Sequence, residues 1–193
     1  IATIDGGTYW RHEDLLPNAR INTAEDANKN GVFDSPDLNG TDEDANGFVD
    51  DVVGWNFTNN SPDPAGLSTT PLSYSHGTAT ASHFGAVANN GIGMTGSSWN
   101  CALLPVCVAS STGDNLIAYG YEGIVYAAVR GAKGINCSWG GLGSPSIFEQ
   151  EVIDHVYAME RDEAKTLASA MALSLMFTRS APASRMSAGT SRA

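Results

Sequence analysis

The sequence predicts an α/β domain in which helices cover a parallel β-sheet. Short apolar segments, several of them ending at glycine, alternate over the first 160 residues with segments whose apolar residues recur at helical spacing. Such alternation of strands and helices is typical of parallel sheets. The 193 residues are enough for one domain with its own core. No apolar run approaches the roughly 20 residues that a membrane span needs.

Each expected element rests on a local pattern. Residues 1–7 form an apolar run that ends in Asp5 and two glycines, which is typical of a buried strand with an acid at its tip. Between residues 115 and 130, apolar side chains recur every three or four positions, which favours an amphipathic helix. In chain order we expect a strand at 1–7, a strand at 52–57, a helix at 77–88, a strand at 103–108, a helix at 115–130, a short strand at 134–141 and a helix at 147–159.

The composition changes near residue 160. Residues 161–193 contain no valine, isoleucine or asparagine, and 14 of these 33 residues are alanine or serine. Because a parallel sheet needs strands rich in valine and isoleucine, we expect the domain to occupy residues 1–160 and its sheet to be incomplete at the C-terminus. The tail, 161–193, is expected to form a helix around 162–177 or to be disordered. We interpret the chain as a fragment, with a tail produced by a frameshift, a truncation or a mispredicted gene end.

Acidic residues gather in the first third of the chain. The net charge is −11, and residues 1–63 contain 13 acidic and 3 basic residues. A field of this sign repels phosphate groups, so nucleic acid is not an expected partner. The local excess of carboxylates favours a bound cation.

Two segments have the spacing of calcium-binding loops. The first acidic loop (residues 26–37) places oxygen-bearing side chains at positions 1, 3, 5, 9 and 12 and a glycine at position 6, where such a loop turns sharply. The second acidic loop (residues 42–50) repeats positions 1, 3, 5, 6 and 9. The alternative is a solvated loop with Asx turns. Neither loop has glutamate at position 12, so an EF-hand with flanking helices is not implied. The candidate calcium ligands are Asp26, Asn28, Asn30, Asp34, Asp37, Asp42, Asp44, Asn46 and Asp50.

An acid and a histidine occupy places suited to proton transfer. Asp5 ends the first expected strand, and His76 opens the small-residue stretch expected to form a closely packed helix. A serine nucleophile needs a histidine to take its proton and a buried acid to orient that histidine. Asp5 and His76 are therefore candidates for two members of a Ser-His-Asp triad. The alternatives are an acid in a turn and a histidine that caps a helix.

Six short motifs follow one another in a distinctive order. They resemble those of the subtilisin-like serine proteases (subtilases), over about residues 1–155, the N-terminal part of the catalytic domain. The motifs are Asp5-Gly6-Gly7, His12-Glu13-Asp14-Leu15, the segment 47–57, His76-Gly77-Thr78, the segment 90–96 and the segment 135–140.

The resemblance implies a secreted, extracellular endopeptidase that acts on a peptide or protein substrate. It implies that Asp5 is the orienting acid and His76 the general base. It also implies that Ser138, Trp139 and Gly140 form an edge that pairs with an extended substrate by strand addition. Structural calcium in the second acidic loop agrees with the family, whose members often carry such loops.

The chain departs from the family pattern at four places, one of them Ala79, where relatives commonly carry a second histidine. Relatives usually have serine or threonine after the catalytic acid, whereas this chain has Gly6, so one hydroxyl donor to the carboxylate is missing. The family's oxyanion-binding asparagine lies on a later strand, and this chain has no asparagine after Asn136. Ser191 lies in a Gly-Thr-Ser sequence like that of the nucleophile, but only two residues follow it, too few for the helix that relatives have there.

Two other functional interpretations remain open. One is a non-catalytic, calcium-stabilised module that binds peptides at the edge described above. The other is a non-functional product that aggregates because missing strands leave an apolar face and an unpaired sheet edge.

The three cysteines do not decide the compartment. Cys101 and Cys107 either form a disulfide or are small buried hydrophobic residues. Cys137 lies beside the expected substrate edge, but no nearby residue favours its thiolate.

Overall fold

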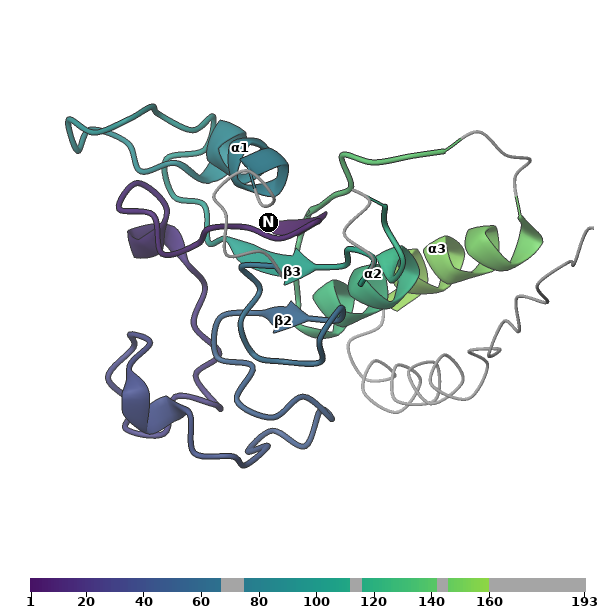
Figure 1. The fold of residues 1–193 in the computed structure, drawn as a ribbon, viewed down its shortest axis with the longest axis horizontal. Helices are drawn as coiled ribbons and strands as arrows, with labels where there is room; N and C mark the ends of the chain where they lie inside the picture. The colour runs from purple at the N-terminus through teal and green to yellow at the C-terminus, as the bar shows by residue number, and fades with distance from the viewer. Residues whose placement is uncertain (67–74, 112–115, 142–145, 160–193) are drawn as a thin grey trace, which may run out of the picture.

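A four-stranded parallel sheet lies at the centre of the computed structural model, which describes residues 1–66, 75–111, 116–141 and 146–159 (Figure 1). The strand order is β2-β3-β1-β4, so the first strand of the chain lies inside the sheet. The strands are β1 (Ala2–Asp5), β2 (Trp55–Asn56), β3 (Leu104–Cys107) and β4 (Ile135–Asn136). The helices are α1 (Ser75–Gly85), α2 (Gly120–Val129) and α3 (Ile147–Met159), with short 3-10 turns η1 (Leu16–Asn18) and η2 (Ser35–Asp37).

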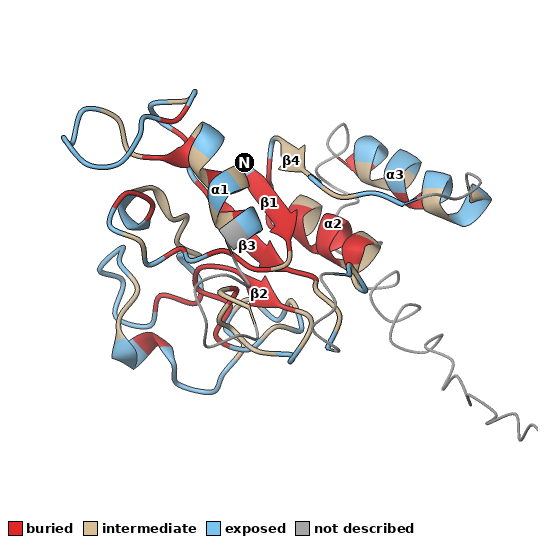
Figure 2. Ribbon diagram, turned by 45° about the horizontal axis from the view of Figure 1, so that its top comes forward, coloured by how far each residue is buried: buried red, intermediate tan, exposed pale blue. Residues whose placement is uncertain are grey.

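Helices α1 and α2 pack on opposite faces of this sheet. Successive residues of a strand point to opposite faces. Gly123 of α2 packs directly against the side chain of Ile4, whereas Gly77 of α1 packs against Asp5. Figure 2 shows β1, β3 and much of α2 as buried. The acid at the end of β1 therefore faces α1, and the apolar face of the sheet is covered by α2.

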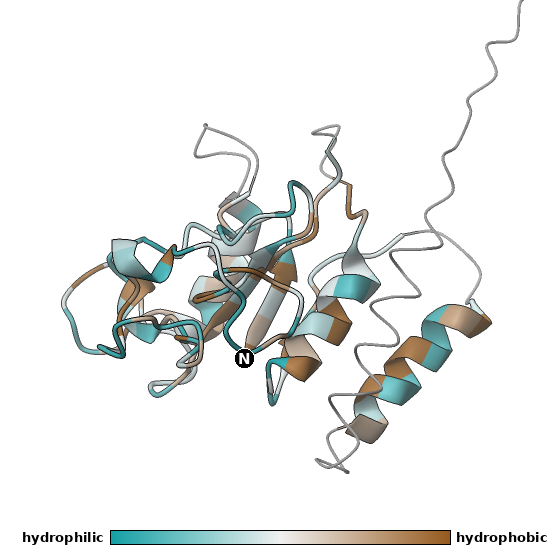
Figure 3. Ribbon diagram, turned by 90° about the horizontal axis from the view of Figure 1, so that it is seen from below, coloured by the Kyte–Doolittle hydropathy of each residue, from teal (hydrophilic) through white to brown (hydrophobic). Residues whose placement is uncertain are grey.

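Helix α3 packs against α2 rather than against the sheet. Figure 3 shows hydrophobic and hydrophilic residues alternating along it. Val152 and Met159 are buried, whereas Ile147 and Tyr157 remain exposed. Within the described residues, no helix combines the length and apolar character that crossing a membrane requires.

The observed elements confirm the expected α/β class, but each of the four strands is shorter than expected, and the helix expected at 77–88 is α1, Ser75–Gly85. The strand expected at 52–57 is reduced to two residues, Trp55 and Asn56, and Val52 and Val53 instead pack beside Trp10. The helix expected from 115 begins at Gly120, because Ala118 donates its N–H to the carbonyl of Val108 and so extends the end of β3. The helix expected around 162–177 lies outside the described residues.

The cysteines are free thiols. Cys101 and Cys107 are both buried, as small apolar residues often are. The disulfide that the sequence left open is therefore not formed, and the second of the two alternatives applies.

Candidate active site

The carboxylate of Asp5 and the imidazole of His76 form a direct pair. His76 Nδ1 lies 2.9 Å from Oδ1 and 3.0 Å from Oδ2 of Asp5. The side chain of Asp5 is 5% exposed and that of His76 is 64% exposed. A carboxylate at Nδ1 favours the tautomer that carries its proton there, which leaves Nε2 as a proton acceptor. The pair thus has the geometry of an orienting acid and a general base.

Two further groups hold the carboxylate of Asp5. The backbone N–H of Gly6 donates to Oδ1 at 2.7 Å, and the hydroxyl of Thr80 lies 3.4 Å from Oδ2. The same hydroxyl lies closer, at 3.0 Å, to the carbonyl of Gly77, so its contact with Asp5 is the weaker one. Thr80 was not among the residues expected at the site. Its position four residues after His76, on the same face of a helix, is the signal that points to it.

The start of α1 lies in direct contact with the chain that follows β1. A Cβ atom on Gly77 would lie 2.2 Å from the carbonyl oxygen of Gly7 and 3.0 Å from Cβ of Asp5. The N–H of Tyr9 donates to the Thr78 hydroxyl at 2.8 Å. Only glycine allows this approach at residue 77, and the approach brings His76 to Asp5.

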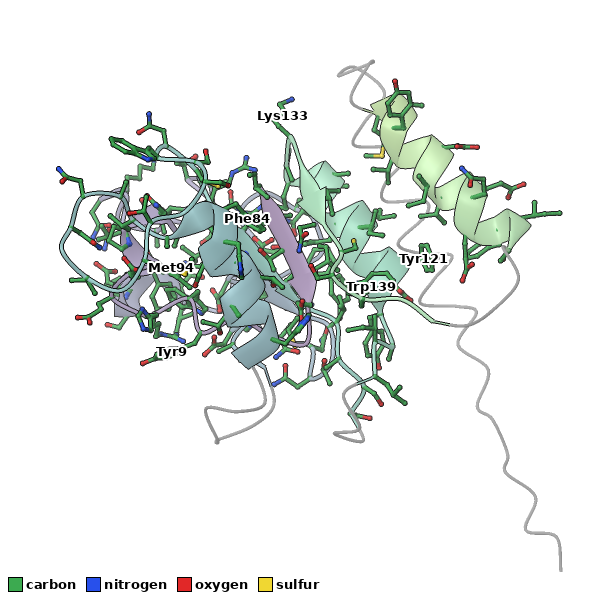
Figure 4. The ribbon with its side chains drawn as sticks, turned by 90° about the horizontal axis from the view of Figure 1, so that it is seen from above. Tyr9, Phe84, Met94, Tyr121, Lys133 and Trp139 are labelled. Carbon is green, nitrogen blue, oxygen red and sulfur yellow. The ribbon has the colours of Figure 1, made fainter. Side chains whose placement is uncertain are left out.

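The edge segment (residues 138–140) follows β4 beside this pair. Ser138 and Gly140 are exposed, and the backbone of the edge segment makes no hydrogen bond within the described part of the chain. Trp139 is partly buried, and its indole Nε1–H donates to the carbonyl of Ile4 at 2.8 Å. Figure 4 shows Trp139 next to Tyr121 at the start of α2. The segment thus offers free backbone groups one strand away from Asp5.

The thiols near Asp5 are poor nucleophiles. Burial, and then the charge of Asp5, raise the pKa of Cys137 to about 11. Burial likewise raises the pKa of Cys107. Because the thiolate is the reactive form, neither thiol is activated for nucleophilic attack.

The two acidic loops fold in the same way. In the first, Asp26 accepts backbone N–H groups from Asn30 at 3.1 Å and from Gly31 at 2.7 Å. In the second, Asp42 accepts the corresponding N–H groups of Asn46 at 3.0 Å and of Gly47 at 2.8 Å. Both glycines have positive φ, and so do the fourth residues of the loops, Lys29 and Ala45. The repeated spacing in the sequence therefore corresponds to a repeated backbone conformation.

Some of the other candidate ligands lie at the centre of a loop, and others accept backbone N–H groups that hold the loop in shape. The Asn28 and Asn30 amides each donate to Asp34, which gathers positions 3, 5 and 9 of the first loop. Asp37 is buried and accepts the N–H groups of Ala27 and Asp34, so it closes the loop. In the second loop, Asp44 and Asn46 lie together, and Asp50 accepts the N–H groups of Asn39 and Gly40.

A third acidic feature joins the second loop to the core. Ligand atoms of Glu25, Asp44 and Asp51 lie within 4.8 Å of one another. Asp51 is fully buried, and its Oδ2 lies 2.6 Å from Nη1 of Arg130 and 2.8 Å from the hydroxyl of Tyr126. Glu25 and Asp51 were not among the expected metal ligands, because neither has a position in the two repeats.

The model of the subtilase family matches residues 1–181. The chain belongs to this family. The match extends beyond about residue 155, the end of the region in which the sequence analysis found a resemblance to the family. It includes both members of the Asp5–His76 pair and the edge segment.

Relatives of this subtilase are proteases by name. Subtilisin-like protease 1 of Plasmodium vivax is 41% identical over 96 residues, which are 50% of this chain and 13% of that protein. A probable subtilase-type serine protease of Deinococcus radiodurans is 30% identical over 165 residues, 84% of this chain and 19% of that protein. The cell wall-associated protease of Bacillus subtilis is 38% identical over 101 residues, 51% of this chain and 10% of that protein. The chain thus spans less than a fifth of the length of each of these three relatives.

The structure of this subtilase brings Asp5 and His76 together and places the edge segment directly after β4, the strand next to β1. Ser191, in the Gly-Thr-Ser sequence, lies outside the residues that the structure describes.

The buried Glu25 should make the stability of the metal-free protein depend on pH. Burial raises the pKa of Glu25 from its ordinary 4.5 to about 7, and the charges of Asp51 and Asp44 contribute. Between these values the folded chain holds one proton more than the unfolded chain. The free energy of unfolding should therefore fall as pH rises from 4.5 to 7, by on the order of 2–3 kcal/mol, and then level off.

Urea unfolding in chelator at several pH values measures this dependence. Glu25→Gln should abolish most of the decrease, and Glu13→Gln, at an exposed position, should leave it unchanged. An equal slope in Glu25→Gln would show that another group titrates.

Proposed function

We propose that this chain carries the acid–base half of a serine endopeptidase site that cleaves peptide bonds. The observation that carries the proposal is the contact of His76 Nδ1 with both carboxylate oxygens of Asp5, at 2.9 and 3.0 Å. In this role Nε2 of His76 takes the proton of a serine hydroxyl as that oxygen attacks the substrate carbonyl, and later gives it to the leaving amine. Asp5 holds the imidazole in position and stabilises its charged form.

The edge segment supports a peptide or protein as the substrate. Ser138 and Gly140 are exposed, and the backbone groups of the segment are free of hydrogen bonds within the described residues. Such a segment suits an extended peptide that adds to the sheet as a further strand. The protease names of the relatives agree with this assignment. The name of the cell wall-associated relative supports the expectation that the protein is extracellular.

We also propose structural calcium in the acidic loops. Their side chains offer carboxylate and amide oxygens, which are the ligands that calcium prefers. Asp26, Asn28, Asn30 and Asp34 would hold an ion in the first loop, and Asp42, Asp44 and Asn46 in the second. Asp37 and Asp50 would complete the two sets of ligands; like Asp26 and Asp42, they also accept backbone N–H groups that shape the loops. The ion would supply charge neutralisation and rigidity, not a step of the reaction.

A non-catalytic peptide-binding module is the second candidate. It is favoured by the edge segment, whose exposed backbone groups could pair with an extended peptide whether or not a nucleophile completes the site. In this alternative the edge segment binds peptides without turnover.

Labelling with a fluorophosphonate probe, followed by peptide mapping, distinguishes the two. The proposal expects one serine to react in the presence of calcium, and His76→Ala to abolish the reaction. His83→Ala is the matched control, since His83 is an exposed histidine on the same helix. In chelator both the labelling and the melting temperature should fall. No labelling of a folded chain that binds peptides would favour the non-catalytic module, and mapping would show whether the reactive residue is Ser191.

A further inference from the structure

Strand β4 leaves the sheet after only two residues. It pairs with β1 through Ala2 with Ile135 and Thr3 with Asn136. The N–H of Ala2 donates to the carbonyl of Gly134, so even-numbered residues of β1 direct their backbone groups toward β4. If this parallel ladder continued, the carbonyl of Ile4 would accept the N–H of Ser138.

The indole of Trp139 occupies that place in the ladder. Its Nε1–H donates to the carbonyl of Ile4 at 2.8 Å, so a side chain replaces the next backbone hydrogen bond. The carbonyl next to Asp5 is thereby satisfied, which matters because an unpaired buried carbonyl is costly. The N–H of Ser138 is left free of β1.

The indole ring is fixed on its other side by α2. A Cβ atom on Gly120 would lie 2.6 Å from the ring, so the ring packs directly on the backbone at the start of the helix. Tyr121 meets it edge-on, with ring centroids 6.4 Å apart and planes at 83° (Figure 4). Trp139 therefore joins three parts of the site: β1 beside the acid, α2 and the edge segment.

We infer that Trp139 is a positioning residue that keeps the edge segment free for an extended peptide and fixes its distance from Asp5. This inference rests on the proposed peptide-binding role of the edge, and it applies to both the catalytic and the non-catalytic candidate. Trp139 acts through Ile4 and the backbone of residues 138–140, not by chemistry of its own. Without the indole donor, the edge segment is free to pair with β1 or to move away from it.

Two variants in the full chain test this role. Trp139→Phe removes the Nε1 donor but keeps an aromatic ring against Tyr121. Trp99→Phe is the control, because Trp99 is 69% exposed. Both are made in a His76→Ala background to prevent turnover. The probe is fluorescein-labelled casein, an unfolded protein that presents many extended sequences, and its binding is followed by fluorescence anisotropy.

The expected result is an about fivefold weaker affinity for Trp139→Phe, which corresponds to the loss of about one hydrogen bond, and no change for Trp99→Phe. Casein should protect the amides of residues 138–140 from hydrogen exchange in the parent chain and less so in Trp139→Phe. Equal affinity and equal protection in both variants would overturn the inference.

Exchange of the indole protons separates this inference from the proposed function. The Nε1 proton of Trp139 should exchange with solvent much more slowly than that of Trp99, whether or not casein binds. If the parent chain fails to bind casein, the proposed substrate role fails. The comparison of the two indole exchange rates still tests the hydrogen bond from Trp139 to Ile4. Fast exchange at Trp139 would refute the bond and with it the positioning role.

Discussion

Gly77→Ala should separate His76 from Asp5 and destabilise the fold by about 2–3 kcal/mol, in the range of overpacked cores. The new methyl group would lie 2.2 Å from the carbonyl oxygen of Gly7, so α1 has to move away from β1. That movement carries His76 away from Asp5. We expect loss of fluorophosphonate labelling together with a lower midpoint of urea unfolding.

Gly6→Ala is the matched control for this change. Gly6 lies next to Asp5, but a Cβ atom there would meet no atom within 4 Å. Its backbone N–H would still donate to the carboxylate of Asp5. Stability and labelling of Gly6→Ala should therefore resemble those of the parent. If Gly77→Ala behaved in the same way, the contact between α1 and β1 would be looser than the structure indicates.

Asp51→Asn should cost about 3–5 kcal/mol of stability, because it leaves the guanidinium of Arg130 buried without a counter-charge. Both side chains are almost completely buried, and their nearest atoms are 2.6 Å apart. Burial raises the pKa of Asp51, and the charge of Arg130 opposes this rise. The change also weakens the hydrogen bond that the Tyr126 hydroxyl of α2 donates to Asp51. Urea unfolding at neutral pH measures the effect.

Two further variants test whether the lost counter-charge causes the destabilisation. Asp63→Asn removes a carboxylate that pairs with Arg11 at 2.8 Å on the surface, and it should cost less than about 1 kcal/mol. Combining Asp51→Asn with Arg130→Met removes both buried charges, so the double variant should be more stable than Asp51→Asn alone. A double variant that is less stable than the single one would show that packing, not charge, dominates at this site.

The sequence predicted the position of Asp5 and His76 because both lie at ends of elements with strong local patterns. The apolar run before Asp5 and the small residues after His76 each define an element without reference to the rest of the chain. The contact between these residues depends on Gly77. The sequence shows that residue 77 has no side chain, but it does not show that residue 77 packs against Gly7. Strand lengths were overestimated because pairing, not hydrophobicity, determines where a strand ends.

The residues that the sequence analysis missed act across long separations. Glu25 and Asp51 meet Asp44 only after the second acidic loop folds back on the chain, and Arg130 directly follows α2, much later in the sequence. Such long-range contacts leave no periodic pattern in the local sequence. Trp139 was expected at the substrate edge, but its bond to Ile4 could be found only from the register of β1 and β4.

The central place of β1 in the sheet has a consequence for the folding kinetics of this protein. Ala2 pairs with Leu104 on one side and with Ile135 on the other, so β1 can pair with neither neighbouring strand until residue 104 has been synthesised. Folds dominated by such distant pairings fold slowly, and their unpaired strands are prone to aggregate in the meantime. During synthesis, β1 and its terminal residue Asp5 are therefore exposed until the later segments have folded around them.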